Sequence, residues 1–329
     1  MKNFLRLRLP LAAMCLAISW LFQGPANAND QPWPSGPIKI IVGFAPGGTS
    51  DVTARIVGEA LSKRLGHPVL VENRPGAQGA IATDTVVRSR PDGYTLLVAP
   101  AEALYMPLVD SNARLDIEKT LAPVTILSTQ PIVVAVNPSS GWKSIADLIA
   151  AAKANPAGVA YATPGPGGTN NIIAELMSRR AGVKFQNIPY KGGGQAVQDL
   201  LSGVVPVGIL GSAPLMPYVK SGRVTLLAVT SKERSTMLPT VPALAELGYP
   251  EIDMTQWFAV FAPAETPKDI VERLSADLRK VLAEPEVKER LGLAALEPVG
   301  GSSEEFSKRL QAEGTIWLRT ARTFGMGKN

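Results

Sequence analysis

The segment over residues 38–51, with the sequence IKIIVGFAPGGTSD, limits the fold more strongly than any other part of the chain. Its short apolar run predicts a buried strand, and the Pro-Gly-Gly turn predicts an abrupt end to that strand. Apolar residues at helical spacing then predict a helix over 49–65. A helix that opens directly after a strand presents unpaired backbone N–H groups and the positive end of its dipole at one point. The sequence therefore predicts a small anion pocket at the carboxyl end of a strand, where open α/β sheets usually hold ligands.

The loop between this strand and helix consists of Pro46, Gly47, Gly48, Thr49, Ser50 and Asp51. In a purely structural role, Thr49 or Ser50 would cap the helix and Asp51 would complement its dipole. Capping does not explain two adjacent glycines after a proline, which let a backbone approach a ligand closely. We therefore favour binding of an anion or carboxylate here, with Asp51 orienting a water or accepting a hydrogen bond from a hydroxyl or ammonium group.

The N-terminus has the pattern of an export signal. A basic head over 2–8 precedes an apolar run over 9–22, and an A-x-A cleavage pattern ends at Ala28. The run is too short to span a membrane, so we expect cleavage after Ala28 and localisation in the periplasm. Cleavage would remove Cys15, the only cysteine, and would lower the formal net charge from +5 to +2, leaving 301 of the 329 residues.

Composition and motifs exclude several classes of protein. Aromatic residues make up 6% of the chain, and no stripe of Lys and Arg carries interleaved aromatics, so no nucleic-acid partner is expected. The mature chain would have no cysteine and only one histidine, His67, which excludes a zinc cluster of the usual kind. No G-x-S-x-G or phosphate-loop motif is present. We expect neither a metal nor an organic cofactor.

Short apolar runs alternate with helical segments along the chain, which predicts an α/β fold with mixed, mostly parallel sheets flanked by helices. A mature chain of about 300 residues exceeds what one core usually serves, so we expect two domains. The expected division is a signal peptide over 1–28, a discontinuous domain 1 over 29–131 plus 256–329, and a domain 2 over 132–255. Further strands are expected over 69–71, 95–98, 123–127, 132–136, 159–161, 185–188, 205–209, 226–229 and 257–261, and helices over 80–88, 145–154, 171–180, 196–202, 267–282, 285–293 and 303–320.

A second glycine-rich loop, TPGPGGTN over 163–170, also follows a predicted strand and opens a predicted helix. It approaches the G-x-G-x-x-G pattern, but no acidic residue follows near 187–190, so we exclude a nicotinamide site. What remains is a second helix N-terminus in domain 2, facing the first across a cleft. Such a pair suits a ligand with two polar ends, and its candidate residues are Thr163, Gly167, Gly168, Thr169 and Asn170.

Two other loops follow predicted strands of domain 2. Gly211 and Ser212 come after the strand over 205–209 and are added to the candidate site. The loop YKGGG over 190–194 contains Lys191, which is either a solvated charge or a source of positive potential near the cleft.

The chain resembles the Bug receptors, the substrate-binding proteins of tripartite tricarboxylate transporters, over essentially its whole mature length. The segments that carry the resemblance are IKIIVGFAPGGTSDVTARIV, VENRPGAQG, PDGYTLLVAP, PYKGGGQAVQDLLSG, LAVTSKERSTMLPTVPALAELGYP and FAPAETPKDIVERL. The resemblance implies a two-domain Venus flytrap that holds a small carboxylate largely through backbone amides and bridging waters. It also implies a monomeric receptor without a cofactor, which is not an enzyme and delivers its ligand to a large and a small membrane subunit.

The resemblance assigns the ligand site to the loops over 46–51 and 163–170, with Phe44 beneath the first loop. The sequence departs from the family at three positions. Gly168 and Asn171 stand where the family often has serine and histidine, and the segment around Leu210 lacks a frequent acidic residue. One hypothesis is that the distal part of the ligand is less polar, either aromatic or aliphatic.

Two other functions remain open at this point. The protein could be a periplasmic enzyme that acts on a small carboxylate, with Asp51 and Lys191 as its acid-base groups. It could also be a ligand sensor that signals through a membrane kinase, because the same closed form could contact either kind of partner.

Overall fold

The computed structural model describes residues 33–101, 103–105 and 117–323. The predicted signal peptide over 1–28 lies outside the described residues. Contacts divide the chain into two units, Met1–Ser35 and Gly36–Asn329, and the fold below is that of the second unit. Within the described ranges, no helix combines the length and the apolar character needed to cross a membrane.

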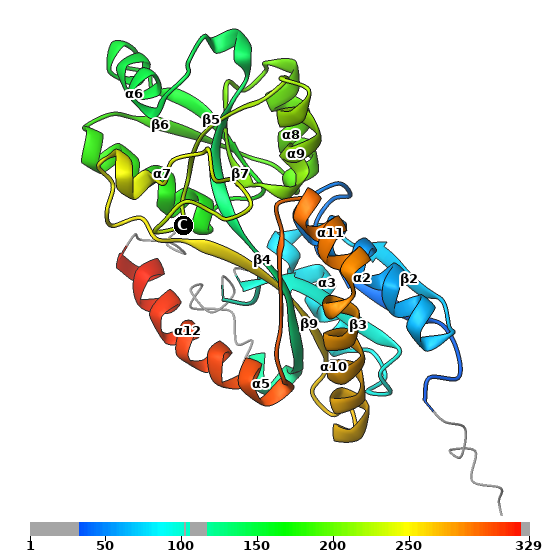
Figure 1. The fold of residues 1–329 in the computed structure, drawn as a ribbon. Helices are drawn as coiled ribbons and strands as arrows, with labels where there is room; N and C mark the ends of the chain where they lie inside the picture. Colours follow the sequence, from blue (N-terminus) through cyan, green and yellow to red (C-terminus); the bar gives the residue numbers. More distant parts are fainter. Residues whose placement is uncertain (1–32, 102, 106–116, 324–329) are drawn as a thin grey trace, which may run out of the picture. The chain divides into compact units, whose positions relative to one another are not determined.

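A mixed sheet of ten strands runs through this unit (Figure 1). Strands β1, β2 and β3 are parallel to one another, as are β5, β6 and β7, whereas β4 and β9 pair antiparallel with their neighbours. The strand order is β2 (Val69–Asn73), β1 (Ile38–Val42), β3 (Thr95–Pro100), β9 (Thr255–Pro263), β4 (Leu121–Val136), β7 (Val207–Gly211), β5 (Val159–Thr163) and β6 (Phe185–Pro189), with β8 (Thr225–Val229) and β10 (Glu297–Gly300) also paired to β4.

Strand β4 joins the two halves of this sheet. From Leu121 to Pro131 it pairs with β9, and from Ile132 to Val136 it pairs with β7 and β8. We call the strands on the first side the β1 half and those on the second side the β5 half. The sequence predicted two strands here, over 123–127 and 132–136, whereas the structure has one strand of 16 residues. The polar residues Ser128 and Gln130 interrupt the apolar pattern, yet both are buried, and their side chains form hydrogen bonds with Thr53 and Thr49 of helix α2 (Thr49–Leu65).

Helices cover both halves of the sheet (Figure 1). In the β1 half, α10 and α11 lie beside α2, so the C-terminal part of the chain contacts its N-terminal part. Helix α12 packs on the sheet through Phe306, whose ring centroid lies 5.5 Å from that of Trp257 and 5.3 Å from that of Phe261. The helices are α2 (Thr49–Leu65), α3 (Ala80–Val87), α5 (Ile117–Thr120), α6 (Ile145–Ala154), α7 (Thr169–Ala181), α8 (Gly193–Ser202), α9 (Met216–Lys220), α10 (Lys268–Ala283), α11 (Pro285–Leu293) and α12 (Ser303–Thr323), with short 3-10 helices at Ala77–Gly79, Pro138–Ser140, Ala213–Leu215 and Leu244–Leu247.

The β5 half has apolar packing on both faces of its sheet. Ile132, Val134 and Val136 belong to one buried cluster, and the alternate residues Val133 and Ala135 belong to another. Because successive side chains of a strand point to opposite faces, this part of β4 must be covered by helices on both sides. In the β1 half, a further cluster contains residues of β1, β3, β9 and α12.

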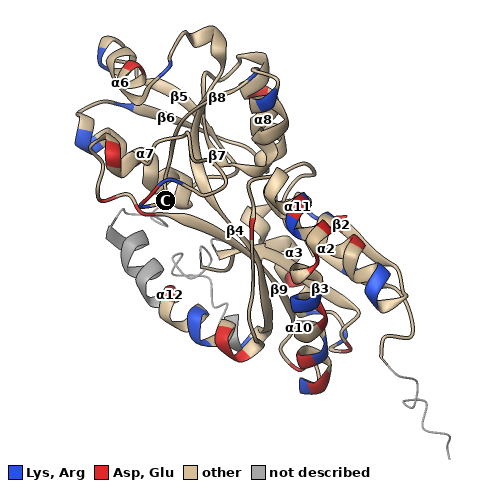
Figure 2. Cartoon of the chain, viewed as in Figure 1, with Lys and Arg blue, Asp and Glu red and all other residues tan. Residues whose placement is uncertain are grey.

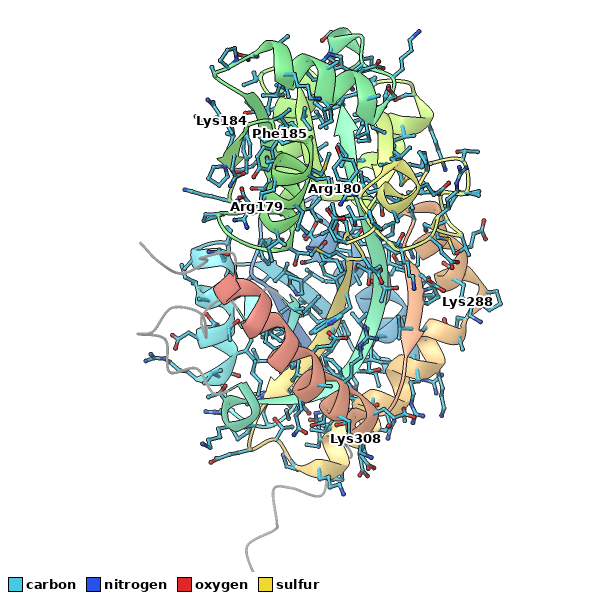
Figure 3. All side chains as sticks on the ribbon, turned by 90° about the vertical axis from the view of Figure 1, so that its left-hand side faces the viewer. Arg179, Arg180, Lys184, Phe185, Lys288 and Lys308 are labelled. Atoms are coloured by element: carbon cyan, nitrogen blue, oxygen red, sulfur yellow. The ribbon has the colours of Figure 1, made fainter. Side chains whose placement is uncertain are left out.

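Charged residues lie mainly on the helices, and the strands carry few of them (Figure 2). In the side view, Lys184, Lys288 and Lys308 lie at the periphery of the molecule (Figure 3). A ligand that binds at the ends of the strands would therefore contact mostly backbone groups and neutral side chains.

Several predicted elements coincide with observed ones, and the differences matter for the site. The helices predicted over 49–65, 145–154 and 285–293 are confirmed residue for residue. The helix predicted over 196–202 begins earlier, at Gly193, and the strand predicted over 205–209 is observed at Val207–Gly211. Glycine has low helix propensity, which is why the sequence did not predict a helix start among three consecutive glycines.

Candidate functional site

A cavity lies between the start of α2 in the β1 half and residues of the β5 half. The space open to the centre of a water molecule is about 30 Å³, so only a few ligand atoms fit in this arrangement of the chain. Its lining residues are Phe44, Gly48, Thr49, Ser50, Pro100, Pro164, Gly193, Leu210, Gly211, Pro214, Gln256 and Phe258.

The N-terminus of α2 opens into this cavity. Gly48 is its N-cap, and within the described chain no side chain caps the helix there. The first helical hydrogen bond runs from the Val52 N–H to the Gly48 C=O, at 3.0 Å. The N–H groups of Thr49 and Ser50 therefore precede the intrahelical hydrogen bonds, and the helix dipole places positive potential beside them. This is the geometry that binds anions.

A second helix N-terminus meets the first at the same place. Helix α8 begins at Gly193, which also lines the cavity, and in the described structure its N-cap, Gly192, makes no side-chain cap hydrogen bond. A Cβ atom added to Gly48 would lie 3.4 Å from the Gly193 nitrogen, so the two helix starts are in close contact. The positive ends of two helix dipoles, one from each half of the sheet, converge on one cavity. The sequence drew attention to the glycines over 192–194 without assigning them to the site.

Asp51 holds the loop before α2 in place. Its Oδ2 accepts a hydrogen bond of 3.0 Å from the Gly47 N–H, and Arg55 Nε lies 3.0 Å from both carboxylate oxygens. Asn73 Nδ2 donates to Asp51 Oδ1 at 2.9 Å and to the Phe44 C=O at 3.1 Å, which ties the end of β2 to the same loop.

The environment of Asp51 favours its ionised form. Burial opposes ionisation, but hydrogen bonds from Arg55, the Gly47 N–H and Asn73, together with the charge of Arg55, outweigh it and hold the pKa of Asp51 below its usual range. The ionised Asp51 carboxylate accepts the hydrogen bond from the Gly47 N–H. Asp51 thereby fixes the loop that borders the cavity, although its own side chain does not line the cavity.

Gln130, on β4, connects cavity residues of the β1 half to residues beside the cavity in the β5 half. Its Nε2 donates to Thr49 Oγ1 at 3.0 Å and to Gln256 Oε1 at 3.1 Å. Its Oε1 accepts from the Ala213 N–H at 3.1 Å and from Ser212 Oγ at 3.3 Å. Gln130 is 2% exposed. A polar residue within an apolar strand was the only sequence signal for it, and our reading of the sequence missed this signal.

Gly211 is needed where this network crosses β7. A Cβ atom there would collide with Gln130 Nε2 and lie 2.7 Å from Thr49 Oγ1. The hydrogen bond between Gln130 and Thr49 lies directly above the Gly211 backbone, and any side chain at position 211 would occupy its space. The glycine at this predicted site position therefore has a structural reason.

The structure brings only some of the predicted site residues to the cavity. Phe44, Gly48, Thr49, Ser50 and Gly211 line it, whereas Pro46, Gly47, Asp51 and Ser212 lie in the adjoining loop and network without lining it. Of the second predicted loop, only Pro164 lines the cavity. The residues predicted from that loop that do not line it are Thr163, Gly167, Gly168, Thr169 and Asn170.

Two of these loop residues have structural partners. Thr163 Oγ1 lies 2.8 Å from Gly165 O and 2.8 Å from Asn187 Oδ1. Asn170 is 3% exposed, and its Nδ2 donates to the Ile209 C=O at 2.8 Å. In this arrangement they hold the loop and the start of α7 against β6 and β7.

The lining that the sequence did not assign to the site comes from strand ends and loops far apart in the chain: Pro100, Gly193, Leu210, Pro214, Gln256 and Phe258. None of the described lining residues has an ionisable side chain, and neither Asp51 nor Lys191 is among them. Across the described residues, no group of three or more His, Cys, Asp or Glu side chains could hold a metal ion. The chemistry of this cavity is therefore that of backbone N–H groups, neutral amide and hydroxyl groups, and apolar walls.

Comparison with known proteins places the chain in a family. Residues 53–325 match the model of the tripartite tricarboxylate transporter family receptor. The chain is similar to BugT of Bordetella pertussis, with 38% identity over 307 residues, covering 92% of each chain.

Solved structures give the same assignment. The periplasmic binding protein BugD is similar with a TM-score of 0.84 and 29% identity, over 89% of this chain and 99% of BugD. A protein of R. palustris, solved with adipate, has a TM-score of 0.84 and 30% identity, over 89% of this chain and 99% of its own. The chain belongs to the tripartite tricarboxylate transporter receptor family and has the mixed α/β fold of its periplasmic binding proteins.

Proposed function

We propose that this protein is a periplasmic solute-binding receptor that captures a small carboxylate between two lobes and delivers it to a tripartite transporter. Lobe 1 comprises residues 29–131 and 256–329, and lobe 2 comprises residues 132–255. The observation that carries the proposal is the meeting of the α2 and α8 N-termini at one cavity. Relatives of the family point the same way, because one of them was solved with adipate.

The ligand carboxylate accepts hydrogen bonds from backbone N–H groups at Thr49 and Ser50 of lobe 1 and at Gly193 of lobe 2. A ligand shifts a conformational equilibrium only through unequal affinity for the two states. Because this anion contacts both lobes only when they are together, it stabilises the closed form. The chain passes between the lobes within β4, at 131–132, and at the start of β9, at 255–256, and these two crossings provide the hinge.

The function is binding, without turnover. The lining described above has no ionisable side chain that could act as a general acid or base, so nothing in it activates the hydroxyl groups of Thr49 and Ser50 as nucleophiles. The receptor works as a monomer without a metal or organic cofactor, and its partners are the large and small membrane subunits of the transporter. Export proceeds through the signal over 1–28, with cleavage after Ala28, in keeping with the periplasmic description of BugD.

A binding experiment with a matched pair of variants tests this proposal. Calorimetric titration and thermal melting with mono-, di- and tricarboxylates should give at least one ligand that raises the melting temperature of the mature protein. Gly48→Val places a branched side chain in the cavity and should weaken that ligand at least tenfold, which is about 1.4 kcal/mol.

Gly36→Val is the control for this experiment. A Cβ atom added at Gly36 also meets nothing within 4 Å, and Gly36 neither lines the cavity nor belongs to a predicted site loop. This variant should bind as the parent does. The proposal fails if no carboxylate stabilises the protein, or if Gly48→Val and Gly36→Val bind equally well.

A further inference from the structure

We propose that the ligand is a monocarboxylate with a compact apolar body, selected by Phe44, Leu210 and Phe258. This inference rests on the proposed function and names the ligand class of the same site. The two helix N-termini provide a binding place for one carboxylate only. The rest of the ligand must contact the cavity walls, and the inference follows from the chemistry of those walls.

The polar groups of the cavity gather around the helix starts. Thr49 and Ser50 belong to the first turn of α2, and Thr49 Oγ1 accepts the hydrogen bond from Gln130. Gln256 also bonds to Gln130, through its Oε1 at 3.1 Å. The Thr49 and Gln256 side chains border the carboxylate position. Part of their hydrogen-bonding capacity is already used by Gln130.

The remaining walls are apolar and come from both lobes. Phe44, Pro100 and Phe258 belong to lobe 1, and Pro164, Leu210 and Pro214 belong to lobe 2. Leu210 is 0% exposed and Phe258 is 2% exposed, so both side chains are covered by protein in this arrangement and would meet the ligand as the lobes part slightly to admit it. An apolar group enclosed between such walls gains free energy through removal of apolar surface from water.

A second carboxylate has no cationic partner here. The described lining contains neither Lys nor Arg, and these residues lie mainly on the helices (Figure 2). Arg55 is near the α2 loop, but its guanidinium is held by Asp51 at 2.9 Å and by Asn73 Oδ1 at 3.1 Å. A charged group buried without a partner is strongly disfavoured, so the cavity selects against a diacid whose second charge would enter it.

The small size of the cavity limits the apolar body. With about 30 Å³ open to the centre of a water molecule, the walls enclose a short aliphatic chain or a single ring only if the side chains turn slightly or the lobes part slightly. Longer or branched polar acids would hold the lobes further apart and lose the contact between the two helix starts.

Calorimetric titration of the mature protein tests the ligand class directly. The probes are butyrate and benzoate, compared with malate, adipate and citrate at equal ionic strength. We expect butyrate or benzoate to bind at least tenfold more tightly than malate. Tighter binding of any of the three polar acids overturns this inference and leaves the proposed function standing. Absence of binding by every carboxylate overturns the proposed function itself.

A variant pair tests the role of the walls. Leu210→Asn has nearly the same size but is polar, and it should lower the affinity for the preferred monocarboxylate at least tenfold and reduce the benzoate-to-malate affinity ratio. Leu70→Asn is the control, since Leu70 is 52% exposed on β2 and does not line the cavity.

A second pair covers the case in which Leu210→Asn does not fold. Phe44→Leu removes a ring from the cavity wall, whereas Phe185→Leu removes a partly buried ring on β6 away from the cavity. Only the first should change the benzoate-to-malate affinity ratio. An unchanged ratio in Phe44→Leu, or an equal change in both variants, overturns the inference.

Discussion

Asp51 shows how a residue can matter for a site without facing it. Its position in the first turn of α2 suggested either a helix-dipole partner or a ligand contact. The structure has its carboxylate bonded to Gly47, Arg55 and Asn73, with 5% of the side chain exposed. The residue fixes the loop that presents the N–H groups of the following residues, so its effect on binding should be indirect.

Removing this carboxylate should loosen the loop and weaken binding. Asp51→Ala leaves the Gly47 N–H without its acceptor and removes one of the two acceptors of the Asn73 amide, and we expect a loss of about 1–3 kcal/mol in the free energy of unfolding. Ligand affinity should fall about tenfold, or about 1.4 kcal/mol. Calorimetric titration measures the ligand affinity, and chemical denaturation measures the free energy of unfolding.

Asn73→Ala provides an independent check, because Asn73 supports the same loop and does not line the cavity. It should change affinity in the same direction. Asp84→Asn is the matched control, since Asp84 also pairs with an Arg four residues later but is 54% exposed. That change should stay within about 0.5 kcal/mol. A full loss of affinity in Asp51→Ala with parent-like binding in Asn73→Ala would instead indicate direct ligand contact by Asp51.

At the scale of the elements, the local signals in the sequence were sufficient for many helices and insufficient for the site. The helix over 49–65 was predicted residue for residue, because its apolar spacing is regular and Gly66 ends it in the left-handed conformation. The start of α8 was missed because glycine weakens the helix signal, although those glycines are what let α8 meet α2. Leu210 and Phe258 reach the same cavity as Gly48 only because β7 and β9 both pair with β4, and no local pattern encodes this long-range pairing.

The loop before α2 is in contact with α8, and a substitution at this contact should affect stability and ligand binding in opposite directions. A Cβ atom at Gly194 would collide with the backbone oxygen of Pro46 across the cleft. Gly194→Ala should therefore block closure, even though alanine favours the helix by about 1 kcal/mol. We expect an unchanged or higher melting temperature without ligand, and an affinity at least tenfold lower.

Small-angle X-ray scattering with and without ligand reports closure in the same samples, and the ligand-induced decrease in radius of gyration should be lost in Gly194→Ala. Gly292→Ala is the control, because Gly292 lies in α11 and a Cβ there meets only the Met237 sulfur, at 3.9 Å. If Gly194→Ala closes and binds as the parent does, the two loops do not need to touch in the bound form.

At the scale of the whole molecule, ion pairs fasten the C-terminal helices to the N-terminal part of the chain. Asp277 on α10 is bonded by Arg64 of α2 at 2.9 Å and by Arg273 of its own helix at 2.6 Å. Arg290 of α11 reaches Glu59 of α2 at 2.9 Å. Of these two connections, the one through Asp277 is the more buried, with 6% of the Asp277 side chain exposed, so it should contribute more to the response to pH.

The pH dependence of stability follows from the direction of the pKa shift. Burial opposes ionisation of Asp277, but hydrogen bonds and charges from Arg273 and Arg64 outweigh it and lower its pKa below the ordinary value of 3.8. A carboxyl with a lowered pKa in the folded state stabilises the protein above the pKa of the unfolded chain, and this contribution disappears as pH falls through the folded value. The same sign applies to Asp51.

The melting temperature should therefore change little between pH 7 and about pH 5, where both carboxylates are ionised in the folded and unfolded states, and should fall as pH is lowered below about 4. Asp277→Asn cannot titrate, so it should lower the melting temperature at pH 7 and show a smaller further decrease between pH 5 and pH 3. Asp84→Asn, at an exposed pair, should keep the parent difference between these two pH values. Thermal melting monitored by circular dichroism across this range provides the measurement. An equal acid-induced decrease in the parent and in Asp277→Asn would show that carboxylates other than Asp277 control acid unfolding, and that the contact between α10 and α2 depends on its apolar packing.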